Sequence, residues 1–313
     1  MHDLVLHHYP ASPFAEKARR LLAYTGLPFA SVEIPVVMPK PDLVALTGGY
    51  RKTPVLQRGA DVYCDTWCIA RVLDAAAPDS QLFLKRLGAV ACAAGRLYDR
   101  DLFMGVLGLL FEPRALAGNI EYLGGAEQIQ AFATDREPML KNAPVRPIRG
   151  SAGHAIVLDN VMRLEAQLRE AGPFLLGERP SIADFCAHHP LWALTKNHIL
   201  RAMLEPYPMV RAWLSRIDDM GPLVSRPMGS QEALQRAAEA QPEALPQATE
   251  QQLGSVAVGD TVTIFASDYA HEPSQGTLVH AGADELVLRR QDEHLGTLHV
   301  HFPRIGYRVR KVG

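Results

Sequence analysis

The sequence of 313 residues has little cysteine, few aromatic residues and no surplus of charge of either sign. The four cysteines, Cys64, Cys68, Cys92 and Cys186, show no paired spacing typical of a metal site and are too few for a disulfide framework. We therefore expect a reducing, cytoplasmic environment. The chain has 32 basic and 34 acidic residues. This balance argues against nucleic acid as a partner, because phosphate binding requires a basic surplus.

Long hydrophobic runs are also absent. The longest, residues 102–111, is far shorter than the ~20 residues that span a bilayer. Residues 1–4 show no basic leader before an apolar segment, so neither a membrane partner nor a secretory signal is expected. What is present, 48% hydrophobic and 21% charged residues, is typical of a folded protein with two or three domains.

Short strands and helices alternate in the first 80 residues. The patterns predict strands over 3–9, 29–34, 53–56 and 62–63, and helices over 13–25 and 66–76. Longer helical patterns follow over 82–112, 125–140, 154–171, 181–200 and 207–219. After residue 255 the period changes to two, which predicts strands over 256–265, 275–280, 285–290, 297–302 and 307–312.

Four short motifs occur along the first 185 residues. They are residues 9–19 (YPASPFAEKAR), 52–56 (KTPVL), 64–69 (CDTWCI) and 180–185 (PSIADF). Each motif alone is weak, but in this order they resemble the glutathione transferase superfamily over residues 3 to about 228. Residues 180–185 read as a capping box and carry no chemistry in either interpretation.

The resemblance implies an α/β thioredoxin-like, glutathione-binding domain at 1–78 and an all-α helical domain at 82–228, and it implies a homodimer. Residues 229–255, rich in Gln, Ala, Glu and Pro, are expected to be a helix fragment and a linker. Residues 256–313 are expected to form an additional small all-β domain, an SH3-like antiparallel barrel that the resemblance does not explain.

Ser12 lies at the predicted start of a helix, before Pro13. A serine at this place is a favoured helix cap. The free N–H groups and partial positive charge of a helix start also stabilise a thiolate, and a hydroxyl can donate one more hydrogen bond to it. Under the resemblance Ser12 is the residue that activates the glutathione thiol. Because serine cannot form a mixed disulfide, we expect attack on an electrophile or isomerisation rather than thiol–disulfide exchange.

Tyr9 is the alternative thiol activator, since another branch of the superfamily uses a tyrosine near the end of the first strand. Its structural interpretation is an aromatic side chain packed at a strand end.

Thr53 and Pro54 are expected to recognise glutathione through the backbone. A cis peptide bond there would turn the N–H and C=O groups of Thr53 outward, where an extended peptide could pair with them. The structural interpretation is an ordinary proline at the start of a strand. Lys52 or Lys40 could meet the glycyl carboxylate of glutathione.

Asp65 and Thr66 lie at another predicted helix start, where both are capping residues. The resemblance implies that Thr66 binds the γ-glutamyl carboxylate and Asp65 its ammonium group. The superfamily usually has Glu-Ser here, so the shorter Asp65 side chain predicts weaker affinity.

The electrophile is expected between the two main domains. Phe14, Tyr98 and Phe103 are the predicted binding residues, with Met104 and Phe111 on the same helix as Tyr98. Gly105 and Gly108 would leave room for a ligand, although the spacing of these residues is equally that of a core.

No metal is predicted. His299 and His301 share one face of a predicted strand, but the sequence supplies no third ligand with a telling position. The sequence therefore predicts an enzyme that activates the thiol of glutathione, its co-substrate, for attack on a small electrophile. The alternatives are a non-catalytic binding or scaffold protein, and a glutathione-dependent isomerase or dehalogenase.

Overall fold

The N-terminal part of the computed structural model, which describes residues 3–312, alternates strands and helices as predicted. Its elements are β1 (Leu4–His8), α1 (Pro13–Thr25), β2 (Phe29–Glu33), α2 (Pro41–Thr47), β3 (Val55–Arg58), β4 (Asp61–Cys64) and α3 (Thr66–Ala76). β1 runs parallel to β2 and antiparallel to β3, and β3 pairs with β4. Helices α1 and α3 contribute to the core on one face of this sheet and α2 to the core on the other, which gives the thioredoxin-like arrangement.

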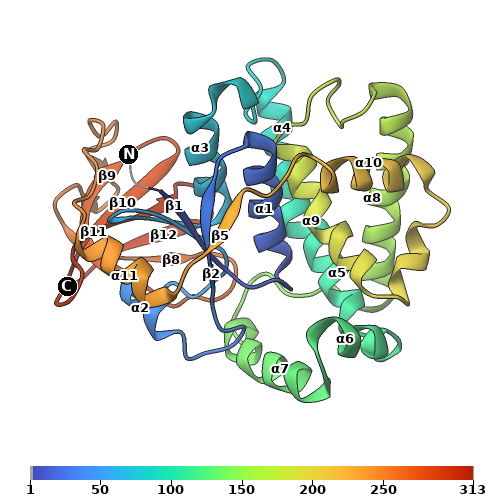
Figure 1. Cartoon of the computed structure of the whole chain (residues 1–313), viewed down its shortest axis with the longest axis horizontal. Helices are drawn as coiled ribbons and strands as arrows, with labels where there is room; N and C mark the ends of the chain where they lie inside the picture. Colours follow the sequence, from blue (N-terminus) through green and yellow to red (C-terminus); the bar gives the residue numbers. More distant parts are fainter. Residues whose placement is uncertain (1–2, 313) are drawn as a thin grey trace.

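The following part is helical, and Figure 1 shows it on one side of the N-terminal sheet. Its helices are α4 (Gly88–Leu97), α5 (Phe103–Leu110), α6 (Leu116–Leu123), α7 (Ala126–Leu140), α8 (Gly150–Ala171), α9 (Ile182–Lys196) and α10 (Pro208–Asp218). Short 3₁₀ turns lie at Pro78–Ser80, Pro113–Ala115 and Leu200–Leu204. The single helix predicted over 82–112 is instead α4 and α5, joined by a π-helical turn at Tyr98–Leu102.

Helix α9 is the centre of the helical part. Every residue from 182 to 194 is buried, which is typical of a helix enclosed on all sides. The predicted capping box is confirmed: the Ser181 N–H donates to Asp184 Oδ2 at 2.8 Å. None of the helices in residues 3–312 has the length and apolar character needed to cross a membrane.

The C-terminal part consists of strands. They are β6 (Gln252–Leu253), β7 (Val256–Ala257), β8 (Thr261–Ala266), β9 (Ser274–Ala281), β10 (Glu285–Asp292), β11 (Gly296–Pro303) and β12 (Tyr307–Lys311). The first predicted strand is divided into β7 and β8, because a turn at 258–260 interrupts it. The predicted all-β character is confirmed, and the barrel form stays a prediction.

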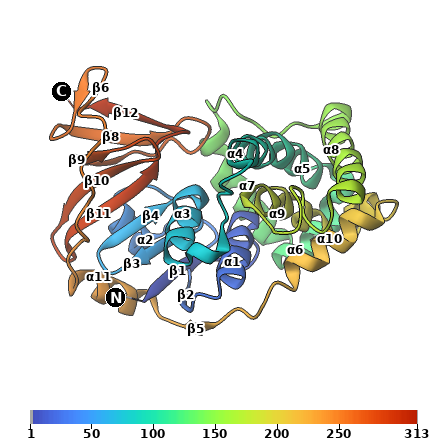
Figure 2. The ribbon, with the colours of Figure 1, turned by 90° about the horizontal axis from the view of Figure 1, so that it is seen from above.

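The C-terminal strands continue the N-terminal sheet, which the sequence did not indicate. Strand β11 pairs in parallel with β4, so that one ten-stranded sheet runs in the order β12-β8-β9-β10-β11-β4-β3-β1-β2-β5. Figure 2 shows this extension on the side away from the helical part. Val62 of β4, Leu46 of α2 and Phe302 of β11 belong to one buried cluster. The C-terminal strands thus share a core with the N-terminal domain.

The chain between the helices and the C-terminal strands is also part of this structure. Strand β5 (Ser225–Pro227), in the region predicted as helical, pairs in parallel with β2. Helix α11 (Ser230–Ala238), in the region predicted as helix fragment and linker, buries Ala233 and Ala237 in the shared core. Its small side chains allow the helix to lie close to the sheet.

Candidate functional site

A cavity of about 540 Å³ lies where the three parts of the chain meet. We call it the central cavity. Most of its wall is apolar, with six cationic side chains and one carboxylate. The lining residues are Tyr9, Ser12, Pro13, Phe14, Arg51, Lys52, Thr53, Phe103, Met104, Leu107, Leu110, Phe111, Phe132, Ala133, Arg136, Glu137, Met139, Leu140, Lys141, Arg146, Pro147, Arg149 and Tyr269. This lining suits an apolar molecule that carries negative charge.

Ser12 lies on the cavity wall at the N-terminus of α1. Its Oγ accepts a hydrogen bond from the Ala15 N–H at 3.2 Å, which confirms the predicted cap, and Pro13 occupies the first helical position. The capping bond uses a lone pair of Oγ, so the hydroxyl proton is still available to a ligand. The residue therefore combines a structural and a potential chemical role.

Tyr9 lies on the same wall, at the end of β1. Its hydroxyl accepts a hydrogen bond from Arg136 Nη2 at 3.3 Å, and the Lys40 ammonium lies 5.4 Å from its ring centroid. Burial, then the nearby Arg136 and Arg51, lower the pKa of Lys40 to about 7. Both candidates for thiol activation thus face one cavity, and Tyr9 has cations around it.

Thr53 and Lys52 enter the cavity from the segment before β3. The Thr53–Pro54 peptide bond is cis, as the resemblance implied, and Pro54 itself is buried and does not line the cavity. Lys40 Nζ donates to Thr53 Oγ1 at 3.3 Å. Lys52 Nζ forms an ion pair of 2.7 Å with Asp268 of the C-terminal part.

The loop between β8 and β9 contributes to the cavity wall, which the sequence did not reveal. Tyr269 lines the central cavity, and the Lys52 ammonium lies 4.0 Å from its ring centroid. Glu272 pairs with Arg51 at 3.3 Å, and the Ala270 N–H donates to the Met139 carbonyl of α7. No local pattern marks these residues, since their partners are far away in the sequence.

Asp65 and Thr66 are not on the cavity wall. Asp65 has a φ of 77°, a strained value for a residue with a side chain, and its Oδ1 caps α3 by accepting from the Trp67 N–H at 2.9 Å. Its Oδ2 accepts from the Tyr307 hydroxyl of β12 at 3.1 Å. Burial raises the pKa of Asp65, and Thr66 is buried as well. Strand β12 therefore covers Asp65, the residue expected to bind the ammonium of the γ-glutamyl group.

The aromatic candidates divide into two groups. Phe14 and Phe103 line the cavity together, with ring centroids 4.7 Å apart in an edge-to-face arrangement. Tyr98 lies in the π-helical turn, packs against the helical core and does not reach the cavity. Burial raises its pKa.

Gly105 and Gly108 leave room for the protein's own chain rather than for a ligand. A Cβ on Gly108 would lie 1.8 Å from the Ile148 carbonyl oxygen, and one on Gly105 would lie 3.2 Å from Ile156. The segment before α8 can therefore pack directly on α5 and support the cavity wall.

Behind Phe14 and Phe103 lies a buried charge cluster that the sequence did not reveal. Asp99 accepts from Lys17 Nζ at 2.7 Å and from the Trp67 indole at 2.8 Å, and His189 Nε2 lies 2.9 Å from its other oxygen. Although burial raises it, the pKa of Asp99 falls to about 2, because Lys17 and His189 stabilise the carboxylate. The rings of His189 and Phe14 pack together with their centroids 4.4 Å apart, so the cluster positions the cavity wall.

Comparison with known proteins agrees with this architecture. Residues 6–81 match the family model of the glutathione S-transferase N-terminal domain, and residues 147–216 match that of the C-terminal domain. A GST-like protein from Pseudomonas syringae is 38% identical, with full coverage of both chains and a TM-score of 0.81. It therefore has the C-terminal extension too. No match was found among curated proteins.

More distant structures share the fold alone. A glutathione S-transferase from Rhodospirillum rubrum F11 is 19% identical over 71% of this chain and 90% of its own, with a TM-score of 0.53. A glutathione S-transferase I bound with lactoylglutathione is 16% identical over 71% of this chain and 99% of its own, with a TM-score of 0.51. Neither match covers the whole of this chain.

Proposed function

Because the chain belongs to the glutathione S-transferase superfamily, we propose that it is an enzyme that binds glutathione and activates its thiol beside Ser12. The observation that carries the proposal is the position of Ser12, a buried helix cap whose hydroxyl lies on the wall of an apolar cavity. The N-terminus of α1 stabilises negative charge there, and thiols at such positions have lowered pKa values.

In the proposed reaction, the glutathione thiol loses its proton to solvent and the thiolate sulfur accepts a hydrogen bond from Ser12. The sulfur then attacks an electrophilic carbon held against Phe14 and Phe103, a carbon–sulfur bond forms, and the leaving group departs with its electron pair. With a chloronitroarene the leaving group is chloride. An isomerisation or dehalogenation would use the same site and differ only in the electrophile. Tyr9 is the alternative hydrogen-bond donor.

Glutathione would reach this position through its peptide. Thr53 would pair with the cysteinyl backbone of glutathione. The cationic side chain of Lys52 would face the glycyl carboxylate once its ion pair with Asp268 is broken. Asp65 and Thr66 would take the γ-glutamyl end only after Tyr307 moves away. The C-terminal strands are thus proposed to control how glutathione is held.

The second candidate is a non-catalytic binding protein. The hydrogen bond between Tyr307 and Asp65 favours it, because it occupies a group that a bound glutathione would need. In that case the central cavity would bind an apolar anion without chemistry. For either function we propose a homodimer in a reducing cytoplasm, in keeping with its free cysteines.

Calorimetry with glutathione and an assay with a chloronitroarene test the two candidates together. The enzyme proposal predicts binding and conjugation, with conjugation by Ser12→Ala reduced at least about tenfold. Ser151→Ala, at an exposed position at the start of α8, is the matched control. Binding without conjugation would support the second candidate, and loss of activity in Tyr9→Phe alone would make Tyr9 the activating residue.

A further inference from the structure

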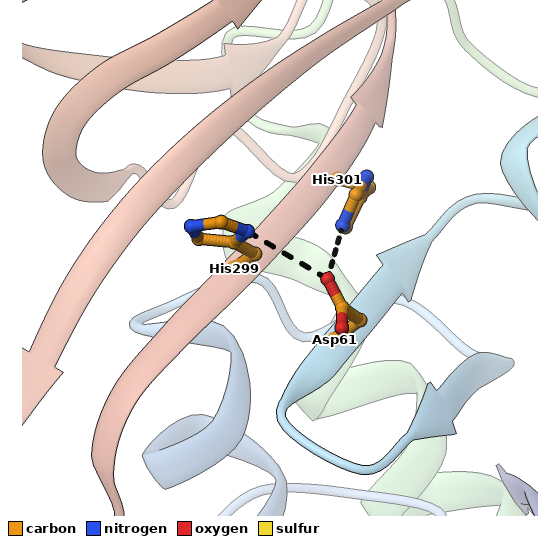
Figure 3. Close-up of side chains that lie close together, drawn as sticks. All are labelled: Asp61, His299 and His301. Carbon is orange, nitrogen blue, oxygen red and sulfur yellow. Dashed lines mark hydrogen bonds and ion pairs between the residues drawn. The ribbon is translucent and has the colours of Figure 1, made fainter. Parts of the chain in front are cut away.

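Two histidines and a carboxylate lie close together where the N-terminal sheet pairs with the C-terminal strands. Asp61 opens β4, and His299 and His301 lie two residues apart on the adjoining strand β11, where His299 is the register partner of Asp61. Figure 3 shows both imidazole rings directed at one carboxylate oxygen. His301 Nε2 lies 3.0 Å from Asp61 Oδ1, and His299 Nδ1 lies 3.7 Å from the same atom.

These separations suit a metal ion at the centre of the three groups. The three ligand atoms all lie within 4.8 Å of one another. Zinc binds imidazole nitrogen and carboxylate oxygen at about 2.0–2.1 Å, so neighbouring ligand atoms of a tetrahedral site are about 3.3 Å apart. The two distances to Asp61 Oδ1, 3.0 Å and 3.7 Å, fall on either side of this value, and small side-chain rotations are enough to equalise them.

The surroundings orient the ligands as a metal site requires. His301 Nδ1, on the side of the ring away from Asp61, lies 3.2 Å from Glu285, and the ring packs on Tyr63 with centroids 4.4 Å apart. A carboxylate on the second nitrogen is the usual support of a metal-bound histidine. Asp61 Oδ2 accepts the Glu243 N–H at 2.8 Å, which leaves Oδ1 free to face the histidines.

The charge balance of the cluster and an unpaired nitrogen atom also favour a metal ion. The Asp61 side chain is 2% exposed, and a buried carboxylate needs a positive partner. A cation bound between Asp61 and the two imidazole rings would supply one. The buried Nδ1 of His299 has no hydrogen-bond partner among residues 3–312. A bound ion would use this nitrogen as well.

We propose that Asp61, His299 and His301 form a site for a divalent transition-metal ion, with zinc as the best fit. Nitrogen and oxygen ligands in a three-residue set match zinc, with a fourth position open to water. The ion would join strands β4 and β11. Because the ligands come from residues 61 and 299–301, binding would stabilise the attachment of the C-terminal strands.

Metal titration of the chelator-treated full chain tests the site. Zinc should bind with one ion per chain and raise the melting temperature, and cobalt(II) should give the absorption bands of a tetrahedral complex. His299→Ala and Asp61→Asn should each weaken zinc binding at least about tenfold. The matched control is His294→Ala, an exposed imidazole in the turn between β10 and β11, which should bind as the wild type does.

Two outcomes would overturn the proposal. One is a wild-type chain that binds no zinc and whose melting temperature does not respond to it, a result that needs no variant. The other is zinc binding that folded His299→Ala retains at full affinity, because the ion would then lie elsewhere, for example on cysteine. Neither outcome decides whether glutathione binds, because Asp61, His299 and His301 do not line the central cavity.

Discussion

The hydroxyl of Tyr307 donates a hydrogen bond of 3.1 Å to Asp65, although the two residues are 242 positions apart. Strand β12 thereby closes the place where the γ-glutamyl end of glutathione is proposed to bind. The C-terminal strands are therefore neighbours of the site as well as an addition to the fold.

Tyr307→Phe should release this carboxylate oxygen while the ring stays in place. We expect glutathione to bind about two- to tenfold more tightly, since a hydrogen bond of about 0.5–1.5 kcal/mol no longer competes with the ligand. Calorimetry measures the change, with Tyr207→Phe in the helical part as the control. An affinity that falls instead would mean that the Tyr307 hydroxyl itself holds the ligand.

Gly108→Ala should destabilise the protein by about 2 kcal/mol or more, because its Cβ would collide with the Ile148 carbonyl in a place where the backbone must move. Gly88→Ala, at the start of α4, has open space around it and is the matched control. Urea unfolding of both variants decides the point. Equal stability of the two would contradict the close packing of α5 on the segment before α8.

Asp99→Asn should leave the ammonium of Lys17, which is fully buried, without its counter-charge. Removing one partner of such a pair costs about 3–5 kcal/mol, while the double variant Lys17→Met with Asp99→Leu should recover only part of the loss, because Trp67 and His189 still lose their partner. Asp159→Asn breaks an exposed pair with Arg163 and should change little. A single variant as stable as the wild type would show that the cluster is not needed for folding.

Stability should fall as the pH drops from about 6.5 towards 4. Burial lowers the pKa of His7 and of His189 to about 4, so in this range the unfolded chain binds protons that the folded chain does not. The unfolding free energy should therefore be lower at about pH 5 than at pH 6.5. His7→Gln should reduce the difference, and the exposed His294→Gln should not. A stability that rises towards pH 5 would contradict the burial of neutral histidine.

Local patterns predicted much of the fold. Ser12-Pro13 marked the start of α1, and Ser181 with Asp184 marked the start of α9, because caps act over three or four residues. The alternating pattern after residue 255 likewise predicted the strands. The parallel pairing of β11 with β4 could not be predicted, since a strand's own sequence does not say which edge it joins.

The same limit applies to the sites. The sequence indicated that His299 and His301 share a face, but the third group, Asp61, lies more than 200 positions earlier. Tyr269 reaches the central cavity, and Tyr307 reaches Asp65, by contacts equally distant in the sequence. Gly105 and Gly108 suggested space for a ligand, and the structure fills that space with the chain before α8. The periodicity of a sequence indicates which residues are buried, but it does not indicate which residues they contact.

The thiol pKa of glutathione bound to the protein is the most direct test of thiol activation by Ser12. The ultraviolet absorption of the thiolate, followed against pH in the complex, should give a thiol pKa at least about one unit below that of free glutathione, or ~1.4 kcal/mol of stabilisation. In Ser12→Ala the value should return towards that of free glutathione, and in Tyr9→Phe it should stay low. The same lowered pKa in Ser12→Ala as in the wild type would contradict the role of Ser12.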